Sequence, residues 1–207
     1  MRILHIVCSP RDGQSTSRRL AIKFIESMRA KDAYLQVDEL NVWKTDLLPF
    51  DGPALEAKYA DLLGQTMSEA QVKVWEQIHS LGGRFHRADL ILFSVPMWNF
   101  GIPYRLKHLI DSVTQRGVLF TFDERGLQGL LSGRKAVVMA SRGVALGPDY
   151  PTEHWDHQVA YLKTWARMVG IYDFHMILNE MTLGGPEIQR ENFAQAARAA
   201  ELIAQQL

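Results

Sequence analysis

ILHIVC (residues 3–8) runs directly into SPRDGQSTS (residues 9–17). The first segment is a short apolar run, too continuous for a half-exposed strand and too short for a helix. The second is a polar loop rich in hydroxyl side chains. After Ser17, apolar residues recur at spacings of three and four, as on one face of a helix. A buried strand, a polar loop and an amphipathic helix in this order are typical of a parallel sheet covered by helices.

The same alternation continues along the chain. Further apolar runs predict strands at 35–42, 90–95, 136–140 and 171–178. Helical spacing predicts helices over 68–87, 104–113, 155–169 and 186–207. Residues 48–67 are interpreted as an irregular insertion, and residues 117–133 as an extra strand or a hairpin. The pattern predicts one α/β domain over 1–207, a flavodoxin-like, doubly wound, five-stranded parallel sheet of order 2-1-3-4-5.

Composition excludes several classes of protein. Hydrophobic residues make up 47% of the 207 residues, and 23 basic residues balance 23 acidic ones, so no charge excess favours a nucleic-acid or membrane partner. One cysteine, Cys8, excludes an intramolecular disulfide and agrees with a reducing compartment. The N-terminal apolar run is too short for a signal peptide, and no stretch has the length of a membrane span. We therefore expect a cytoplasmic protein.

The loop 9–17 has the features of a phosphate site. In an open parallel sheet, ligands bind beyond the carboxyl ends of the strands. A helix N-terminus offers free N–H groups and a partial positive charge there. Four hydroxyl side chains can add donors: Ser9, Ser15, Thr16 and Ser17. The alternative is that one of residues 15–17 only caps the helix, although four hydroxyls exceed what one cap needs.

Two classes of phosphate ligand are excluded because their binding motifs are absent from the sequence. The chain lacks G-x-x-x-x-G-K-[ST], which cradles nucleoside triphosphates, and G-x-G-x-x-G, which binds dinucleotides. A monophosphate such as FMN fits the loop better.

A second loop, PMWNFGIP (residues 96–103), follows the predicted third strand. Two prolines and a glycine restrict its path, while Met97, Trp98 and Phe100 can form a flat apolar wall for a planar heterocycle. The alternative is a hydrophobic turn that only covers the end of the sheet.

Three motifs together resemble one known family. SVPMWNFGIPYRLK (residues 94–107) is similar to the P-M-Y-N-F-x-I-P-x-x-L-K signature of the FMN-dependent NADH-azoreductases. The opening Ser9-Pro10-Arg11 with the helix start at 15–17, and Ser141-Arg142-Gly143 after the fourth strand, resemble the same family. Because the motifs occur in the right order at strand ends, the resemblance covers essentially the whole chain.

The resemblance implies one FMN per subunit, in a homodimer with its active sites at the interface. It implies that the FMN phosphate binds at Ser9, Ser15, Thr16 and Ser17. It implies that the rest of FMN binds at Pro96, Met97, Trp98, Asn99 and Phe100, and at Ser141, Arg142, Gly143 and Val144. It further implies a ping-pong reaction in which NADH or NADPH supplies hydride equivalents for quinones, or for aromatic azo compounds that are cleaved to amines. Since the flavin carries this chemistry, no catalytic side chain is assigned.

Some positions differ from the usual family residue, and others have two possible roles. Trp98 stands where the family usually has tyrosine, and Val144 where a second glycine is common. By resemblance, Phe122 and Trp165 border the acceptor pocket, although a tryptophan at helical spacing is also typical of a core. His154 and His157 lack further ligands at suitable spacing, so no metal site is predicted.

Two other functions that occur on this fold agree less well with the sequence. A flavodoxin-type electron carrier would need no nicotinamide pocket, but such carriers are usually strongly acidic and this chain has no net charge. A response-regulator switch needs a phosphorylatable aspartate after the third strand, where this chain has Ser94. The enzyme is the preferred interpretation and the electron carrier its alternative.

Overall fold

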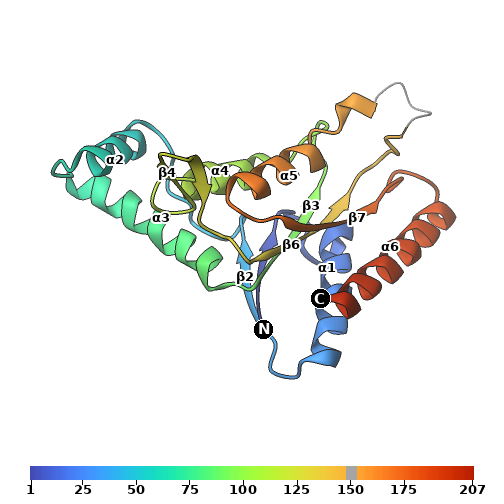
Figure 1. The fold of residues 1–207 in the computed structure, drawn as a ribbon. Helices are drawn as coiled ribbons and strands as arrows, with labels where there is room; N and C mark the ends of the chain where they lie inside the picture. The colour runs from blue at the N-terminus through green and yellow to red at the C-terminus, as the bar shows by residue number, and fades with distance from the viewer. Residues whose placement is uncertain (148–152) are drawn as a thin grey trace.

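The central feature is a parallel five-stranded sheet. The computed structural model describes residues 1–147 and 153–207 (Figure 1). The strands are β1 (Arg2–Val7), β2 (Gln36–Asn41), β3 (Leu90–Pro96), β6 (Lys135–Ser141) and β7 (Asp173–Asn179). They lie in the order β2-β1-β3-β6-β7, all parallel. Counted along the chain, this is the predicted order 2-1-3-4-5.

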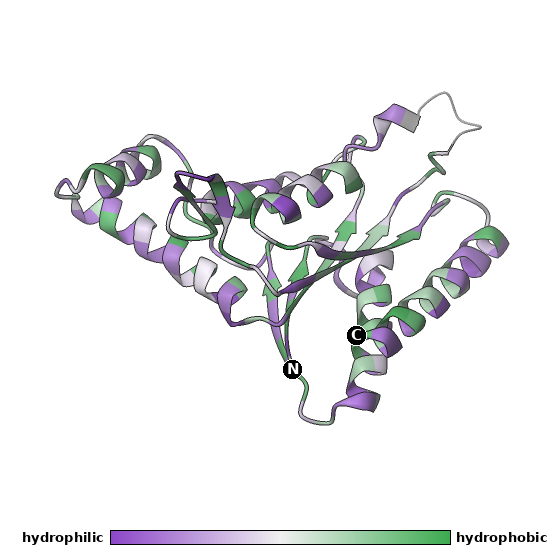
Figure 2. Cartoon of the chain, viewed as in Figure 1, coloured by the Kyte–Doolittle hydropathy of each residue, from purple (hydrophilic) through white to green (hydrophobic). Residues whose placement is uncertain are grey.

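Helices cover both faces of the sheet (Figure 1). One face holds α1 (Thr16–Lys31) and α6 (Pro186–Gln206), which pack side by side. The other holds α3 (Glu69–Arg87), α4 (Tyr104–Val113) and α5 (Val159–Met168), with α2 (Gly52–Leu63) packed on α3. Figure 2 shows that the helices mix hydrophobic and hydrophilic residues, as expected for elements with one face on a core.

The strand sequences explain this two-sided burial. Successive side chains of a strand point to opposite faces. In β1, Leu4 and Ile6 join the core under α3–α5, whereas Ile3 joins the core under α1 and α6. In β3, Phe93 and Leu92 divide in the same way. Both faces are apolar because both are covered, which is why these strands appear as uninterrupted apolar runs.

Residues 48–67 are not the irregular insertion that the sequence predicts, because they contain α2. Pro53 lies in the first turn of this helix and Gly64, with φ of +64°, ends it as a left-handed C-cap. Proline in the first turn and glycine at the C-cap are typical of the ends of a helix, so they do not indicate an irregular segment here. Ala54 and Ala57 supply a buried face of small residues, which an analysis of large apolar side chains misses.

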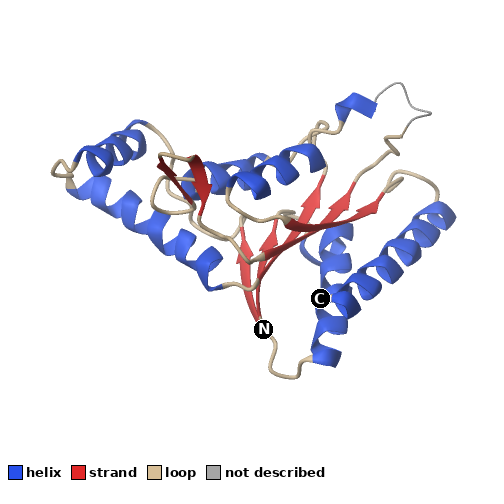
Figure 3. Ribbon diagram, viewed as in Figure 1, coloured by secondary structure: helices blue, strands red, loops and turns tan. Residues whose placement is uncertain are grey.

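Other boundaries are close to the predictions. The helix predicted at 155–169 begins later, at Val159, after a short 3-10 helix, Glu153–Trp155, because the Asp156 carboxylate accepts the Val159 N–H (3.0 Å). The helix predicted at 104–113 has these bounds in α4, with Pro103 as its N-cap. The hairpin expected within 117–133 is present as β4 (Phe120–Asp123) and β5 (Gly126–Gly129), drawn as two short red strands in Figure 3. No helix in the described residues is long and apolar enough to span a membrane.

Candidate functional site

A polar cavity of about 530 Å³ lies at the carboxyl ends of β1, β3 and β6. This size is within the range of about 300–1,000 Å³ typical of small-molecule sites. The loops after those strands supply most of its wall, and α1, α6 and the loop after β7 supply the rest. The lining residues are Ser9, Pro10, Arg11, Gln14, Ser15, Thr16, Arg19, Pro96, Met97, Trp98, Ser141, Arg142, Gly143, Thr182, Leu183 and Gln189.

One end of the cavity is the start of α1. Ser15 is the N-cap of the helix, and its hydroxyl accepts the Arg18 N–H (3.3 Å) and lies 3.2 Å from the Ser17 hydroxyl. Ser15 therefore does act as a cap, but it also lines the cavity together with Thr16. The first N–H groups of a helix have no intrahelical partner, so this end offers donors and partial positive charge to an anion.

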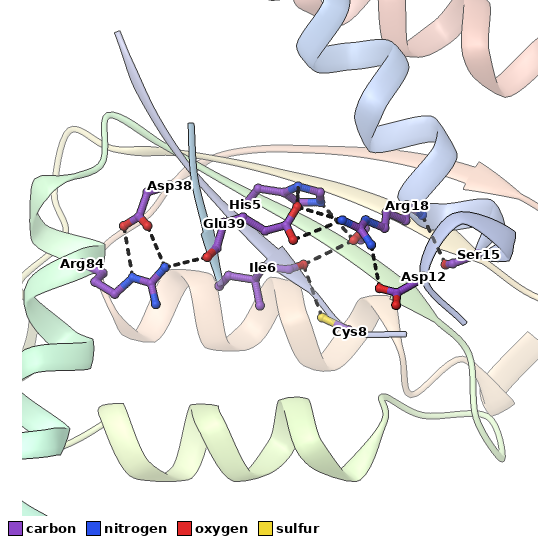
Figure 4. Close-up of polar contacts among 10 residues, drawn as sticks. His5, Ile6, Cys8, Asp12, Ser15, Arg18, Asp38, Glu39 and Arg84 are labelled. Atoms are coloured by element: carbon purple, nitrogen blue, oxygen red, sulfur yellow. Dashed lines mark hydrogen bonds and ion pairs between the residues drawn. The ribbon is translucent and has the colours of Figure 1, made fainter. Parts of the chain in front are cut away.

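A charged network holds this loop in shape, as Figure 4 shows. Asp12, with φ of +46°, accepts a hydrogen bond from Arg18 (2.7 Å) and pairs with Lys44 (3.0 Å). These two cations hold the pKa of Asp12 below its usual value. Arg18 also pairs with Glu39 (3.0 Å) on β2. The Arg18 guanidinium is thus occupied by carboxylates behind the loop, and it is absent from the cavity wall.

His5 and Cys8 lie buried under the same loop. Burial, with the nearby Arg18 charge, lowers the pKa of His5 to about 4, and its Nε2 lies 3.1 Å from the Ser94 hydroxyl. Glu39 lies 3.9 Å from the imidazole, which would favour protonation, but that carboxylate is already paired with Arg18 and burial dominates. Burial likewise raises the pKa of the Cys8 thiol, so Cys8 is an inert core residue.

The opposite end of the cavity is the loop after β3. Trp98 and Gly101 exchange both backbone hydrogen bonds (3.0 and 2.9 Å) across a tight turn. Asn99 and Phe100, between them, have φ of +46° and +66°. Asparagine tolerates this region, but phenylalanine is strained there, and such strain often marks a functional loop. The Met97 N–H donates to the Ser141 carbonyl (2.7 Å), which joins the β3 and β6 loops.

Arg142 is a buried cation in the cavity wall. It is 2% exposed, and its guanidinium pairs with Asp156 (3.1 Å) and Glu180 (3.3 Å). Its Nη1 has no hydrogen-bond partner among the described residues. Asp156 also accepts the Val159 N–H at the start of α5 (3.0 Å), and Glu180 accepts the Leu146 N–H (3.1 Å). Arg142 therefore ties three loops together at the edge of the cavity.

The charge of the wall indicates an anionic ligand. Three arginines line the cavity, Arg11, Arg19 and Arg142, and no aspartate or glutamate is among the described residues that line it. Because Arg142 is already paired with Asp156 and Glu180, Arg11 and Arg19 are the cations left to attract a ligand. Arg19 lies 4.4 Å over the Phe193 ring, which steadies its guanidinium. Serine hydroxyls, a helix N-terminus and arginines at one end, with a methionine–tryptophan wall at the other, fit a ligand with a phosphate and a flat ring.

Nine of the residues predicted for the cofactor site line this one cavity. They are Ser9, Ser15, Thr16, Pro96, Met97, Trp98, Ser141, Arg142 and Gly143. Four others lie beside it and are not part of its wall: Ser17, Asn99, Phe100 and Val144. Ser17 is fully buried, and its hydroxyl supports Ser15 instead.

The two aromatics predicted for an acceptor pocket lie elsewhere in the chain. Phe122 lines a separate apolar cavity of about 380 Å³ with Leu62 and Trp75. Trp165 is 4% exposed, packs edge-on against Phe93 and donates its indole N–H to Thr114 (3.0 Å). Within one chain, Trp165 is therefore a core residue. This was the alternative to a pocket role, because a tryptophan at helical spacing is typical of a core.

The cavity also contains residues that were not predicted. Thr182 and Leu183 come from the loop after β7, and their N–H groups donate to the carbonyls of Arg142 and Gly143 (3.1 and 3.2 Å). A Cβ at Gly143 would lie 2.7 Å from the Leu183 side chain, so a larger residue there would require this exposed leucine to move. Gln189 comes from the first turn of α6. The strand-end rule could have found the β7 loop had it been applied to all five strands.

A larger groove of about 950 Å³ lies between α4 and α5. It includes Ile102 and Tyr104, which immediately follow the β3 loop, together with Lys107 and Tyr161. Burial raises the pKa of Tyr161 to about 12, with a contribution from Asp111. Its mixed charges and apolar walls do not have the anion-binding character of the polar cavity.

Comparisons with known proteins agree with the fold. A family model described as "Flavodoxin-like fold" matches residues 1–203. FMN-dependent NADH:quinone oxidoreductase 2 of Pseudomonas syringae pv. tomato is 62% identical over 204 residues, 99% of this chain and 98% of its own. FMN-dependent NADH:quinone oxidoreductase 3 of Pseudomonas fluorescens is 41% identical over 209 residues, 100% of this chain and 97% of its own.

Solved structures share the fold at lower identity. An azoreductase from Bacillus anthracis str. Sterne superposes with a TM-score of 0.92 at 21% identity, over 100% of both chains. An FMN-dependent NADH-azoreductase from Bacillus anthracis str. Ames Ancestor, solved in complex with FMN, has a TM-score of 0.87 at 24% identity, over 98% of this chain and 99% of its own. The solved structures show the shared fold, and the family model and the curated relatives show that the chain belongs to the flavodoxin-like-fold family of FMN-dependent NADH:quinone oxidoreductases.

Proposed function

We propose that this chain is an FMN-dependent NAD(P)H oxidoreductase that reduces quinones and cleaves aromatic azo compounds. The observation that carries the proposal is the charge of the polar cavity, in which Arg11 and Arg19 have no carboxylate among the described lining residues, while Arg142 is paired with Asp156 and Glu180 behind the wall. A strongly anionic group is expected in such a wall. FMN supplies that group as its phosphate, and the names of the curated relatives support this choice.

The residues divide the work of binding. Ser9, Ser15 and Thr16 would hold the phosphate together with the first N–H groups of α1. Met97 and Trp98 would pack against the flat ring. The backbone of residues 141–143 would face the pyrimidine end, where the ion pairs of Arg142 with Asp156 and Glu180 hold the loop in position.

When bound, FMN supplies two-electron redox chemistry, taking electrons from NADH or NADPH and giving them to an acceptor in ping-pong order. A quinone needs one such round to become a hydroquinone. An azo compound needs a second round to become two amines. The chain's own residues bind and orient the reactants, and no side chain has to transfer a proton for either step.

We expect the active unit to be a homodimer with one FMN per subunit. The groove between α4 and α5 supports this, because it adjoins the β3 loop at Ile102 and Tyr104 and a second copy seated there would close the open side of the site. A dimer would also let the exposed Phe122 of one subunit reach the acceptor pocket of the other. Sedimentation should give twice the chain mass of 23.6 kDa, and a monomer at micromolar concentration would refute this part.

Anaerobic addition of NADH tests the proposed activity. The FMN-loaded protein should lose its flavin absorbance within one turnover and recover it on addition of a quinone. A flavodoxin-type electron carrier, the alternative, would stay yellow until a separate reductase was added. Persistent flavin colour with both NADH and NADPH would therefore overturn the proposal.

A further inference from the structure

Trp43 lies just after β2 and contacts both ends of the polar cavity without lining it. Its indole N–H donates to the carbonyl of Cys8 (3.0 Å), the residue that precedes the serine loop. Its ring lies 5.5 Å from the Trp98 ring and 5.3 Å from Tyr104, which it meets edge-on. Since Trp98 forms the ring end of the cavity, one half-buried side chain joins the two loops that face each other there.

The turn that carries Trp43 is itself firmly held. The Asn41 side chain accepts the Trp43 N–H (2.9 Å). Arg105, on α4, donates to the carbonyls of Val42 (2.9 Å) and Thr45 (3.0 Å), one on each side of the tryptophan. The indole therefore projects from a support that is fixed to both the sheet and α4.

Trp98 has little other support for its ring. Its backbone is fixed by the turn with Gly101, but the side chain is 37% exposed. Among the described residues, the rings in contact with it are Trp43 and Tyr104, and Tyr104 is 64% exposed. Trp43 is thus the inner of its two aromatic neighbours.

We propose that Trp43 is a positioning residue for the flavin site, which sets the orientation of the Trp98 ring and its distance from the loop that begins at Ser9. The inference rests on the proposed FMN site. A rigid ligand that spans both loops binds best when their separation is set in advance, because less ordering is then needed on binding. No part of this role requires Trp43 to touch the ligand.

A double-mutant cycle tests whether Trp43 acts through Trp98. FMN dissociation constants would be measured by titration of the apoprotein for the wild type, Trp43→Leu, Trp98→Leu and the double variant. We expect each single change to weaken binding by about tenfold, the order expected for a lost aromatic contact. The double variant should bind about as weakly as Trp98→Leu alone, because coupled residues are not additive.

One spectroscopic measurement and one rescue variant separate positioning from general stability. In the apoprotein, Trp43→Leu should remove the same near-ultraviolet circular dichroism signal as Trp98→Leu, since the rings form one pair. Trp43→Phe keeps a ring against Trp98 but loses the hydrogen bond to the Cys8 carbonyl, so it should bind FMN more tightly than Trp43→Leu and more weakly than the wild type. Failure of phenylalanine to rescue affinity would assign the effect to the hydrogen bond and overturn the Trp98 role.

Trp75 provides a matched control. It is a tryptophan of α3, 7% exposed, and its indole N–H is unpartnered among the described residues. Trp75→Leu should lower the melting temperature and leave the FMN dissociation constant unchanged. The role of Trp43 is overturned if the losses of FMN affinity in the cycle are additive, or if Trp75→Leu weakens FMN binding as much as Trp43→Leu. The proposed function would survive either result. A wild-type protein that binds no FMN would overturn the proposed function as well.

Discussion

The loop after β1 and the loop after β3 face each other across the polar cavity, but different forces hold them in shape. The first is fixed by a helix cap at Ser15 and by ion pairs from Asp12 to Arg18 and Lys44. The second is fixed by a tight backbone turn at residues 98–101 and by aromatic contacts of Trp98. One end of the site is thus electrostatic, and the other depends on packing and backbone conformation.

Because different forces hold the two ends, we expect changes in solution conditions and changes in side chains to act on different ends. Acid and salt should affect the β1 end, because its groups are charged or titratable. Side-chain shape and backbone freedom should affect the β3 end. Changes confined to one end should leave the other measurably intact.

Acidification should have the largest effect, through His5. Its folded pKa of about 4 lies below the ordinary value of 6.5, so the unfolded chain binds more protons between these values. Stability should be complete above pH 6.5 and fall by on the order of 3 kcal/mol as pH drops to 4. Urea unfolding of the apoprotein at pH 7.5, 6, 5 and 4, values chosen to bracket this window, measures the loss.

His5→Gln is the control for this effect, because glutamine does not titrate. The variant should lose most of the pH dependence within this window. The lowered carboxyl pKa values of Asp12 and Asp38 act only at lower pH. A variant that loses stability as steeply as the wild type would show that another group is responsible.

Backbone conformation at Asn99 should have the next largest effect. A β-branched residue at φ of +46° is strained, so Asn99→Val should cost about 1–2 kcal/mol and distort the turn. Asn99→Gly satisfies the same backbone and should be close to neutral. Thermal unfolding and FMN titration of both variants measure this, and equal behaviour of the pair would contradict the role of the turn.

Loss of the helix cap should have a smaller effect on stability. Ser15→Ala should lower the free energy of unfolding by about 1 kcal/mol and also weaken FMN binding, because the hydroxyl serves both. Ser68→Ala removes the capping box of α3, away from the cavity, and should cost a similar amount of stability with unchanged FMN affinity. FMN weakened equally in both variants would mean that Ser15 acts only as a cap.

Salt should give the smallest effect. Arg11 is exposed in the cavity wall, so its attraction for a phosphate is screened by ions. FMN affinity should fall severalfold between about 20 and 500 mM salt, and Arg11→Gln should make this dependence shallower. A salt response of the same slope in the variant would remove Arg11 from the phosphate site.

Much of this structure can be predicted from the sequence, but the patterns that allow it differ from one region to another. Continuous apolar runs predict the buried strands well, because β1 and β3 have both faces covered. The helix α2 was missed because its buried face is alanine and its proline and glycine lie at its two ends. Short-range patterns show helix ends and large apolar faces better than small-residue packing.

The site divides in a similar way. Hydroxyl chemistry and a helix start identified the β1 loop, whereas the β6 loop was identified by family resemblance. Arg19 and Gln189 were missed, because they reach the cavity from α1 and α6. Their contribution depends on how α1 and α6 pack on the sheet, which local sequence does not specify.

In the proposed site, the phosphate of FMN binds at the arginine and serine end of the polar cavity. Equilibrium titration of the apoprotein with FMN and with riboflavin, which lacks the phosphate, tests this directly. We expect FMN to bind with one equivalent per chain and about 100-fold more tightly than riboflavin, the order expected for several charge-assisted hydrogen bonds. Equal affinities for the two compounds would contradict the account.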